Sequence, residues 1–251
     1  MRYLILLFLL SMAITAQSQH SKVPTLKGLW VQEDYVRHLV KHKSPAAAYK
    51  LFDQGAADLN INDSTGIPFV INASTGNKMG GFLWEVTGYD QASSQFIATG
   101  RTGWSSEAVP FRLQWSVVSK DTLLTQIDAR GAVLRKYIKL SSAIFQDPYQ
   151  WIINHLLWEG QYEGLGPDGA VRYPSIRVNS HLQTKGFGPY PSFVLETDFS
   201  PPNSLRNKIS FENGETFEYE FRGDYVYFYL PLDHNDNILQ KGNLLFIWKK
   251  R

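Results

Sequence analysis

The sequence contains no cysteine among its 251 residues. Disulfide scaffolds, thiolate zinc sites, iron–sulfur clusters, cysteine nucleophiles and lipid attachment through a cysteine are therefore excluded. A dominant charge is lacking too, because 25 Lys and Arg stand against 23 Asp and Glu, for a formal net charge of +2. No long basic block occurs, so the clustered positive surface that nucleic acid requires is not expected.

Long apolar runs are scarce, and the clearest one lies at the N-terminus. Arg2 precedes an apolar stretch over 3–10, and small and polar residues follow over 11–19. This pattern predicts a signal peptide over 1–19, with cleavage near Ala16-Gln17. We expect an exported, soluble protein, periplasmic or extracellular and of bacterial type, with no membrane span after cleavage.

The mature part alternates apolar and polar residues with a period of two. Phe111, Leu113 and Trp115 alternate with polar neighbours, and Phe217, Tyr219 and Phe221 do the same. Such alternation puts one face of a strand on a core and the other in water, as in antiparallel sheets. The pattern predicts strands near 28–34, 58–62, 68–73, 81–88, 95–101, 111–118, 121–128, 133–140, 160–165, 171–179, 181–187, 192–199, 207–212, 215–222, 224–231 and 243–249.

Short helices interrupt this pattern at three places. Asp34 is expected to cap the first, and Ser44-Pro45 to begin the second and Gly55 to end it. The third is expected over 148–157, capped by Asp147, with Trp151, Ile152, His155 and Leu156 on its apolar face, so that Trp151 and Leu156 are buried. This connector helix divides the mature chain into modules at 20–145 and 146–251, with one continuous β-rich domain as the alternative.

Gly28-Leu29-Trp30 at the start of the first strand resembles the Gly-x-Trp motif of lipocalins. The two helices that follow resemble the helical lid of fatty-acid-binding proteins, a related barrel family. The resemblance implies an all-β fold of one or two antiparallel lipocalin-like barrels or strongly curved sheets, with two short helices after the first strand and one connector helix. It also implies binding of a small apolar or amphipathic molecule.

Polar clusters offer weaker alternatives. His38 and His42 share one helix face, but neighbouring lysines favour an exposed face over a metal site. Residues 233–237 have the oxygen donors of a calcium loop without its central glycine, and an ordinary turn is favoured. Glu196 and Asp198 point to one strand face, as a glycosidase carboxylate pair would, although solvated positions are favoured.

The sequence has no serine-nucleophile elbow, phosphate loop or dinucleotide fingerprint. We therefore expect a non-catalytic protein without cofactor or metal, which binds a small apolar or amphipathic molecule. The alternatives are an enzyme acting on envelope or extracellular glycans, or an interaction protein whose strand 225–230 forms an edge. Aromatic side chains combine area with a polar handle. The expected binding residues are Trp30, Trp84, Trp115, Tyr219, Tyr227 and Tyr229.

Overall fold

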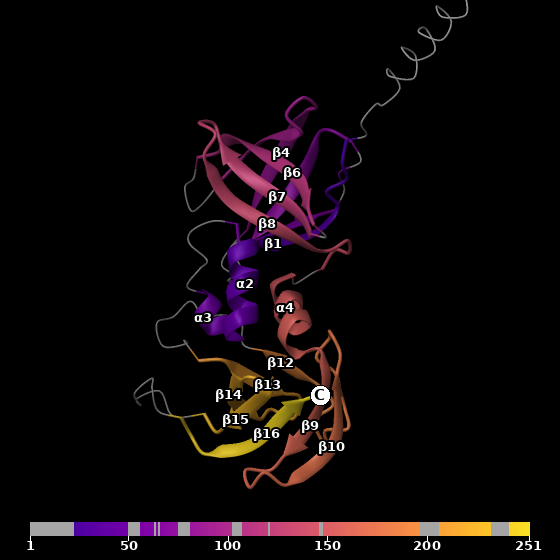
Figure 1. The fold of residues 1–251 in the computed structure, drawn as a ribbon, viewed down its shortest axis with the longest axis vertical. Coiled ribbons are helices and arrows are strands. Elements are labelled where there is room, and N and C mark those ends of the chain that lie inside the picture. The colour runs from indigo at the N-terminus through magenta and orange to yellow at the C-terminus, as the bar shows by residue number, and fades with distance from the viewer. Residues whose placement is uncertain are drawn as a thin grey trace, which may run out of the picture.

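The computed structural model is a two-barrel structure with helices between the barrels (Figure 1). The predicted signal peptide over 1–19 lies outside the described residues. The structure describes residues 23–49, 56–62, 64, 66–74, 81–101, 107–119, 121–145, 148–195, 206–231 and 241–251.

The first eight strands form a closed antiparallel barrel in sequence order. The last strand returns to the first, with Trp30 opposite Lys139, and this pairing removes both sheet edges. The strands are β1 (Gly28–Gln32), β2 (Asp58–Ile61), β3 (Phe69–Ser74), β4 (Gly81–Asp90), β5 (Gln95–Gly100), β6 (Val109–Val118), β7 (Asp121–Asp128) and β8 (Val133–Ser141).

The other eight strands form a second sheet, in the order β11-β10-β9-β16-β15-β14-β13-β12. A single bridge between Gln183 and Ser192 joins its two ends, so this barrel is nearly closed. The strands are β9 (Gly160–Leu165), β10 (Val171–Val178), β11 (Thr184–Lys185), β12 (Phe193–Leu195), β13 (Lys208–Phe211), β14 (Thr216–Arg222), β15 (Tyr225–Tyr229) and β16 (Leu244–Lys250).

The all-β prediction is confirmed, and most strands lie within two or three residues of their expected bounds. The strand expected over 181–187 is shorter, because the chain turns there. Leu182 has a φ of 58° and its amide donates to the carbonyl of Asn179, while Gly186 has a φ of 89°. Only two residues between these turns remain extended, as β11.

The helical segments of the described part of the chain lie between the barrels (Figure 1). Two follow β1, as predicted: α2 (Glu33–His42) and α3 (Pro45–Tyr49). Asp34 is not the cap of α2, because the helix begins one residue earlier, at Glu33. Ser44 does cap α3, since its Oγ accepts a hydrogen bond from the amide of Ala47 at 3.2 Å.

The connector is α4 (Pro148–Ile153) continued by a π-helix, η1 (Asn154–Trp158). The expected cap Asp147 and the expected stop Gly55 lie outside the described residues. The amide of Glu159 donates to the carbonyl of Asn154, five residues back, so the turn is wider than in an α-helix.

This wider turn changes which connector residues are buried. The side chains of Ile152, Leu157 and Trp158 are at most 4% exposed. Trp151 and Leu156, which were expected to be buried, are only partly so. The prediction assumed a constant period of 3.6 residues, and the extra residue in the π turn shifts the buried position from Leu156 to Leu157. Trp151 precedes this turn and stacks between Phe145 and His155.

Two apolar cores result from this arrangement. The smaller fills the first barrel with side chains that alternate inward along its strands. The larger begins on the outer face of β1 at Leu29 and Val31, continues through Leu39 and Leu157 of the helices, and fills the second barrel. Every strand pairing among the described residues joins two strands of the same barrel. The division into two modules stays a prediction, since the larger core spans both.

Among the described residues, no helix combines the length and apolar character needed to cross a bilayer.

Candidate functional site

Two of the predicted ligand-binding tryptophans, one in β1 and one in β4, lie inside the first barrel. Trp30 and Trp84 are fully buried. The indole Nε1 of Trp30 donates to the carbonyl of Leu26 at 2.7 Å, and that of Trp84 donates to the carbonyl of Arg101 at 2.7 Å. Trp115 is partly buried against the same core. These indoles fill the barrel interior, and their contact with a ligand stays a prediction.

The three predicted tyrosines lie on opposite faces of the second barrel. Tyr219 of β14 is buried in the core, where its ring lies 4.9 Å from that of Trp158. Tyr227 and Tyr229 of β15 alternate with the buried Val226 and Phe228, and therefore face outward. The expected sheet edge at 225–230 is wrong, because β15 pairs with β14 on one side and β16 on the other.

A polar cleft of ≈ 260 Å³ lies where the α2–α3 corner meets the second barrel. Two of the predicted residues, Tyr219 and Tyr229, line it. The other lining residues come from four separate parts of the chain: His42, Lys43, Ser44, Arg206, Asn207, Glu218, Glu220, Phe221 and Lys241.

Ion pairs hold the two carboxylates of this polar cleft in place. Arg206 lies 2.6 Å from Glu218, and their side chains are only 15% and 9% exposed. Glu220 pairs with Lys241 and with Arg222, the latter at 2.7 Å. Burial disfavours the charged form of Glu220, but hydrogen bonds from Lys241 and Arg222 outweigh it and hold the pKa below its usual value.

Tyr229 forms an aromatic part of the wall. Its residue is 8% exposed, and the ammonium of Lys241 lies 5.3 Å from the ring centre. Burial is the main reason why the pKa of Tyr229 is raised, so its hydroxyl keeps its proton at neutral pH. It can therefore both donate and accept a hydrogen bond.

The α2–α3 corner is fixed to the barrel by Asn207. Its Oδ1 accepts from the amide of Ala46 at 3.0 Å, and its Nδ2 donates to Ser44 Oγ at 3.1 Å. Lys43, in a left-handed conformation with φ 49°, ends α2 and donates from Nζ to the carbonyl of Gly223 at 2.5 Å. Contacts of this kind across more than 150 residues position the corner over the second barrel.

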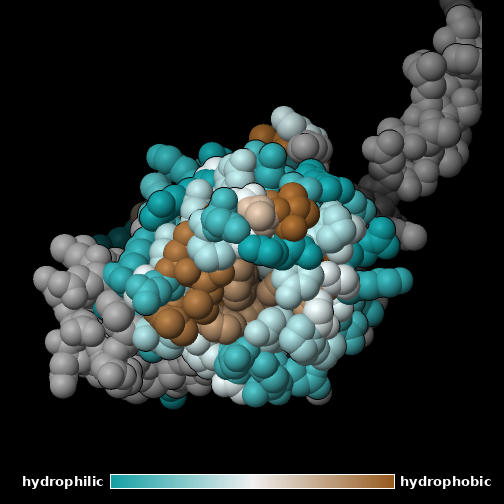
Figure 2. Space-filling view, turned by 90° about the horizontal axis from the view of Figure 1, so that it is seen from below, coloured by the Kyte–Doolittle hydropathy of each residue, from teal (hydrophilic) through white to brown (hydrophobic). Residues whose placement is uncertain are grey.

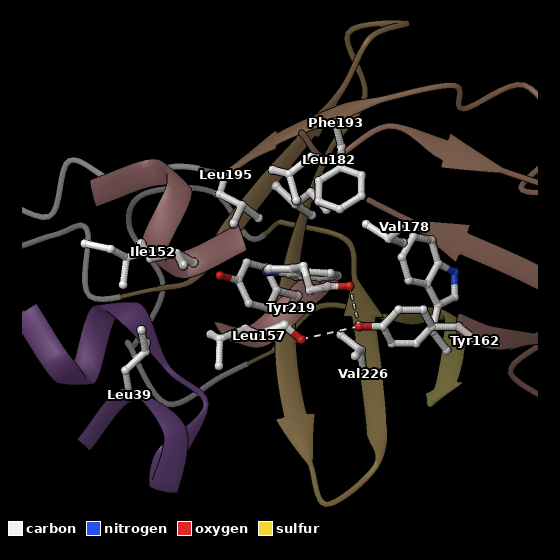
Figure 3. Packing of buried hydrophobic residues seen from close by; sticks show 14 of the residues in the cluster. Leu39, Ile152, Leu157, Tyr162, Val178, Leu182, Phe193, Leu195, Tyr219 and Val226 are labelled. Carbon is white, nitrogen blue, oxygen red and sulfur yellow. Dashed lines mark hydrogen bonds between the residues drawn. The ribbon is translucent and has the colours of Figure 1, made fainter. Parts of the chain in front are cut away.

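A smaller, mainly apolar pocket of ≈ 70 Å³ adjoins the polar cleft and shares Lys43 and Phe221 with it. Figure 3 shows three of its lining residues, Leu157, Tyr162 and Val226, where η1 meets the second barrel. The hydroxyl of Tyr162 donates to the carbonyl of Trp158 at 2.7 Å, which fixes this wall. The remaining lining residues are Val40, Leu156, Gly223, Asp224 and Lys250.

Lysines stand at the rim of the apolar pocket. Burial, together with the nearby charge of Lys43, lowers the pKa of Lys250. Lys43 and Lys250 both line the pocket, and the ammonium of Lys43 donates to the carbonyl of Gly223, another lining residue.

Of the two histidines singled out from the sequence, His42 lines the polar cleft and His38 is not among its lining residues. The imidazole rings of His38 and His42 lie with their centres 4.3 Å apart and their planes tilted by 34°. No group of three or more metal-ligating side chains occurs in the described part of the chain. Glu196, Asp198 and the sequence 233–237 lie outside the described residues.

Apart from Tyr219 and Tyr229, the residues that line the polar cleft were not predicted from the sequence as binding residues. Glu218 and Glu220 alternate on a predicted strand, which is the same signal that drew attention to Glu196 and Asp198. No sequence signal marks Lys43 or Arg206, because their proximity depends on how α2 meets the barrel.

A further apolar surface lies elsewhere. Figure 2 shows apolar side chains around a hollow on the side of the second barrel that faces away from the helices.

Comparisons with protein-family models, curated proteins and solved structures found no match for this chain.

Proposed function

We propose that this protein binds a small amphipathic molecule, without catalysing a reaction, in the cleft between α2 and the second barrel. One observation carries the proposal: a polar compartment and an apolar compartment adjoin and share Lys43 and Phe221. A ligand with one polar and one apolar end would satisfy both walls at once, whereas a purely apolar ligand would leave charged groups desolvated and unpaired.

The closed eight-stranded barrel is compatible with a lipocalin-like fold, and we propose an exported binding protein of this kind. The site, however, is placed at the edge of the second barrel. Large side chains such as Trp30 and Trp84 already fill the interior of the first barrel. A ligand there would have to displace packed aromatic groups, at a cost of several kcal/mol.

The test uses calorimetric titration of the full chain with hexanol, hexanoate and hexyl glucoside. We expect at least one of these amphiphiles to bind with one-to-one stoichiometry. Val40→Trp should weaken that binding about tenfold, or about 1.4 kcal/mol. Val40 lines the apolar pocket but is 50% exposed, so a larger side chain there fills the pocket without disturbing the core.

Val117→Trp is the matched control. Val117 is 55% exposed on β6 of the first barrel and should leave binding unchanged. If none of the amphiphiles binds, or if both tryptophan variants weaken binding equally, the proposed site is wrong. Binding that survives Val40→Trp would instead point to another apolar surface, such as the hollow in Figure 2.

A further inference from the structure

The relative sizes of the two compartments bear on what the ligand is. The polar cleft measures ≈ 260 Å³ and the apolar pocket ≈ 70 Å³. The polar cleft is thus between three and four times as large as the apolar pocket. A lone carboxylate would leave most of the polar compartment empty, so the volumes favour a ligand whose polar part is the larger.

The polar lining contains both donors and acceptors, and its charges are largely paired. Glu218 and Glu220 present carboxylate oxygens, while Arg206 and Lys241 present N–H groups, and each carboxylate already has a cationic partner. Hydroxyl groups donate and accept in turn, so a neutral polyhydroxylated group can bond to every one of these side chains. An anionic head group would meet the two carboxylates at close range, which is unfavourable.

The wall also provides an aromatic surface beside these polar groups. Tyr229 and the partly buried Phe221 both line the cleft. Carbohydrate rings have an apolar face of C–H groups that packs on aromatic rings, and their hydroxyls reach the polar side chains at the ring's edge.

Resting on the proposed function, we infer that the polar part of the ligand is a neutral glycosyl group of hexose size, held by Glu218, Glu220 and Arg206 beside Tyr229. The ligand class is thus a small alkyl or acyl glycoside. The paired carboxylates act as fixed hydrogen-bond acceptors for sugar hydroxyls, and their ion pairs prevent them from being left as uncompensated charges when water is displaced.

The experiment titrates the full-length wild-type protein with four probes that share a six-carbon chain: hexyl glucoside, hexyl galactoside, hexanoate and hexanol. We expect one of the two glycosides to bind at least tenfold more tightly than hexanol, and hexanoate to bind no more tightly than hexanol. This comparison needs no variant, so a folding defect cannot obscure it.

A charge-removing variant then localises the effect. Glu220→Gln keeps the shape of the side chain and should weaken glycoside binding about tenfold while leaving hexanol unchanged. Glu163→Gln is the matched control, because Glu163 also pairs with an arginine, Arg251 at 2.9 Å, and is not among the cleft residues. It should change neither affinity.

The outcomes separate the two proposals. If hexanol binds but neither glycoside binds more tightly, the glycosyl inference is wrong and the amphiphile site stands. Tightest binding of hexanoate would show that the cleft selects an anion, and would overturn the inference in the same way. If none of the four probes binds, the proposed function itself fails. Equal loss in Glu220→Gln and Glu163→Gln would also overturn the glycosyl assignment.

Discussion

The indole of Trp158 lies fully buried at the centre of the second barrel, although it comes from the connector rather than from a strand. Its ring centre is 4.9 Å from Tyr219, 5.1 Å from Phe193 and 6.0 Å from Trp248. A tryptophan buries about 150–250 Å², which at about 25 cal/mol per Å² contributes about 4–6 kcal/mol. We expect Trp158→Ala to lower the free energy of unfolding by about 4 kcal/mol.

Substitution by phenylalanine isolates a finer effect. Among the described residues, Nε1 of Trp158 has no hydrogen-bond partner although it is buried, whereas Nε1 of Trp30 donates to the carbonyl of Leu26. Trp158→Phe therefore removes an unsatisfied donor, while Trp30→Phe leaves a buried carbonyl without its donor. An unsatisfied buried group costs about 1–3 kcal/mol, so Trp158→Phe should be the milder change by about that amount.

Urea unfolding followed by far-ultraviolet circular dichroism measures both variants. If the two barrels unfold in separate transitions, Trp30→Phe is compared with the wild-type transition of the first barrel and Trp158→Phe with that of the second. Trp248→Phe is a second test in the same barrel, since the Nε1 of Trp248 is also buried without a partner in the described part of the chain. Equal destabilisation by Trp158→Phe and Trp30→Phe would refute the reasoning, because it would mean that the Trp158 N–H is satisfied in solution.

Three further predictions concern the first barrel and alkaline pH. Gly28→Ala should destabilise the protein by about 2 kcal/mol or more in thermal unfolding, because Gly28 has a φ of 129° and an added Cβ would lie 2.1 Å from the carbonyl oxygen of Ser141; an unchanged melting temperature would contradict this. Gln126→Met should raise the free energy of unfolding by about 1–3 kcal/mol, since neither end of this buried carboxamide has a hydrogen-bond partner among the described residues; a loss of stability would show that the carboxamide is bonded after all. Burial raises the pKa of Tyr137 and Tyr162 above the usual value of 10, so their contribution is complete below pH 10 and is lost as the pH rises further. Tyrosinate absorbance of these two groups should therefore appear only together with unfolding, and reversible ionisation in the folded protein would count against it.

The local sequence pattern determined the strands and several of their ends. Period-two alternation places strands over 121–128 and 160–165, where β7 and β9 have the same bounds. Ser44-Pro45 predicts the start of α3, and Ser44 caps it. These features depend on neighbours within a few residues, because strand alternation and helix capping are short-range effects.

The local pattern could not predict which side of the barrel each tyrosine faces, or which residues of the connector are buried. Tyr219, Tyr227 and Tyr229 have similar surroundings in the sequence, but the pairing of β14 with β15 puts the first inside the barrel and the others outside. The π turn at Asn154 appears only where the connector packs its residues against both barrels. A fixed helical period could not reveal it.

Tertiary structure alone decided the candidate site. Asn207 bonds to Ser44 across 163 positions, and Arg206, which precedes β13, reaches Glu218 of β14. Such contacts depend on how the second barrel curls and, for Ser44, on how the α2–α3 corner packs against it. The polarity of the cleft is thus the sum of residues that are unremarkable in their own segments, and long-range packing, which no local pattern encodes, brings them together.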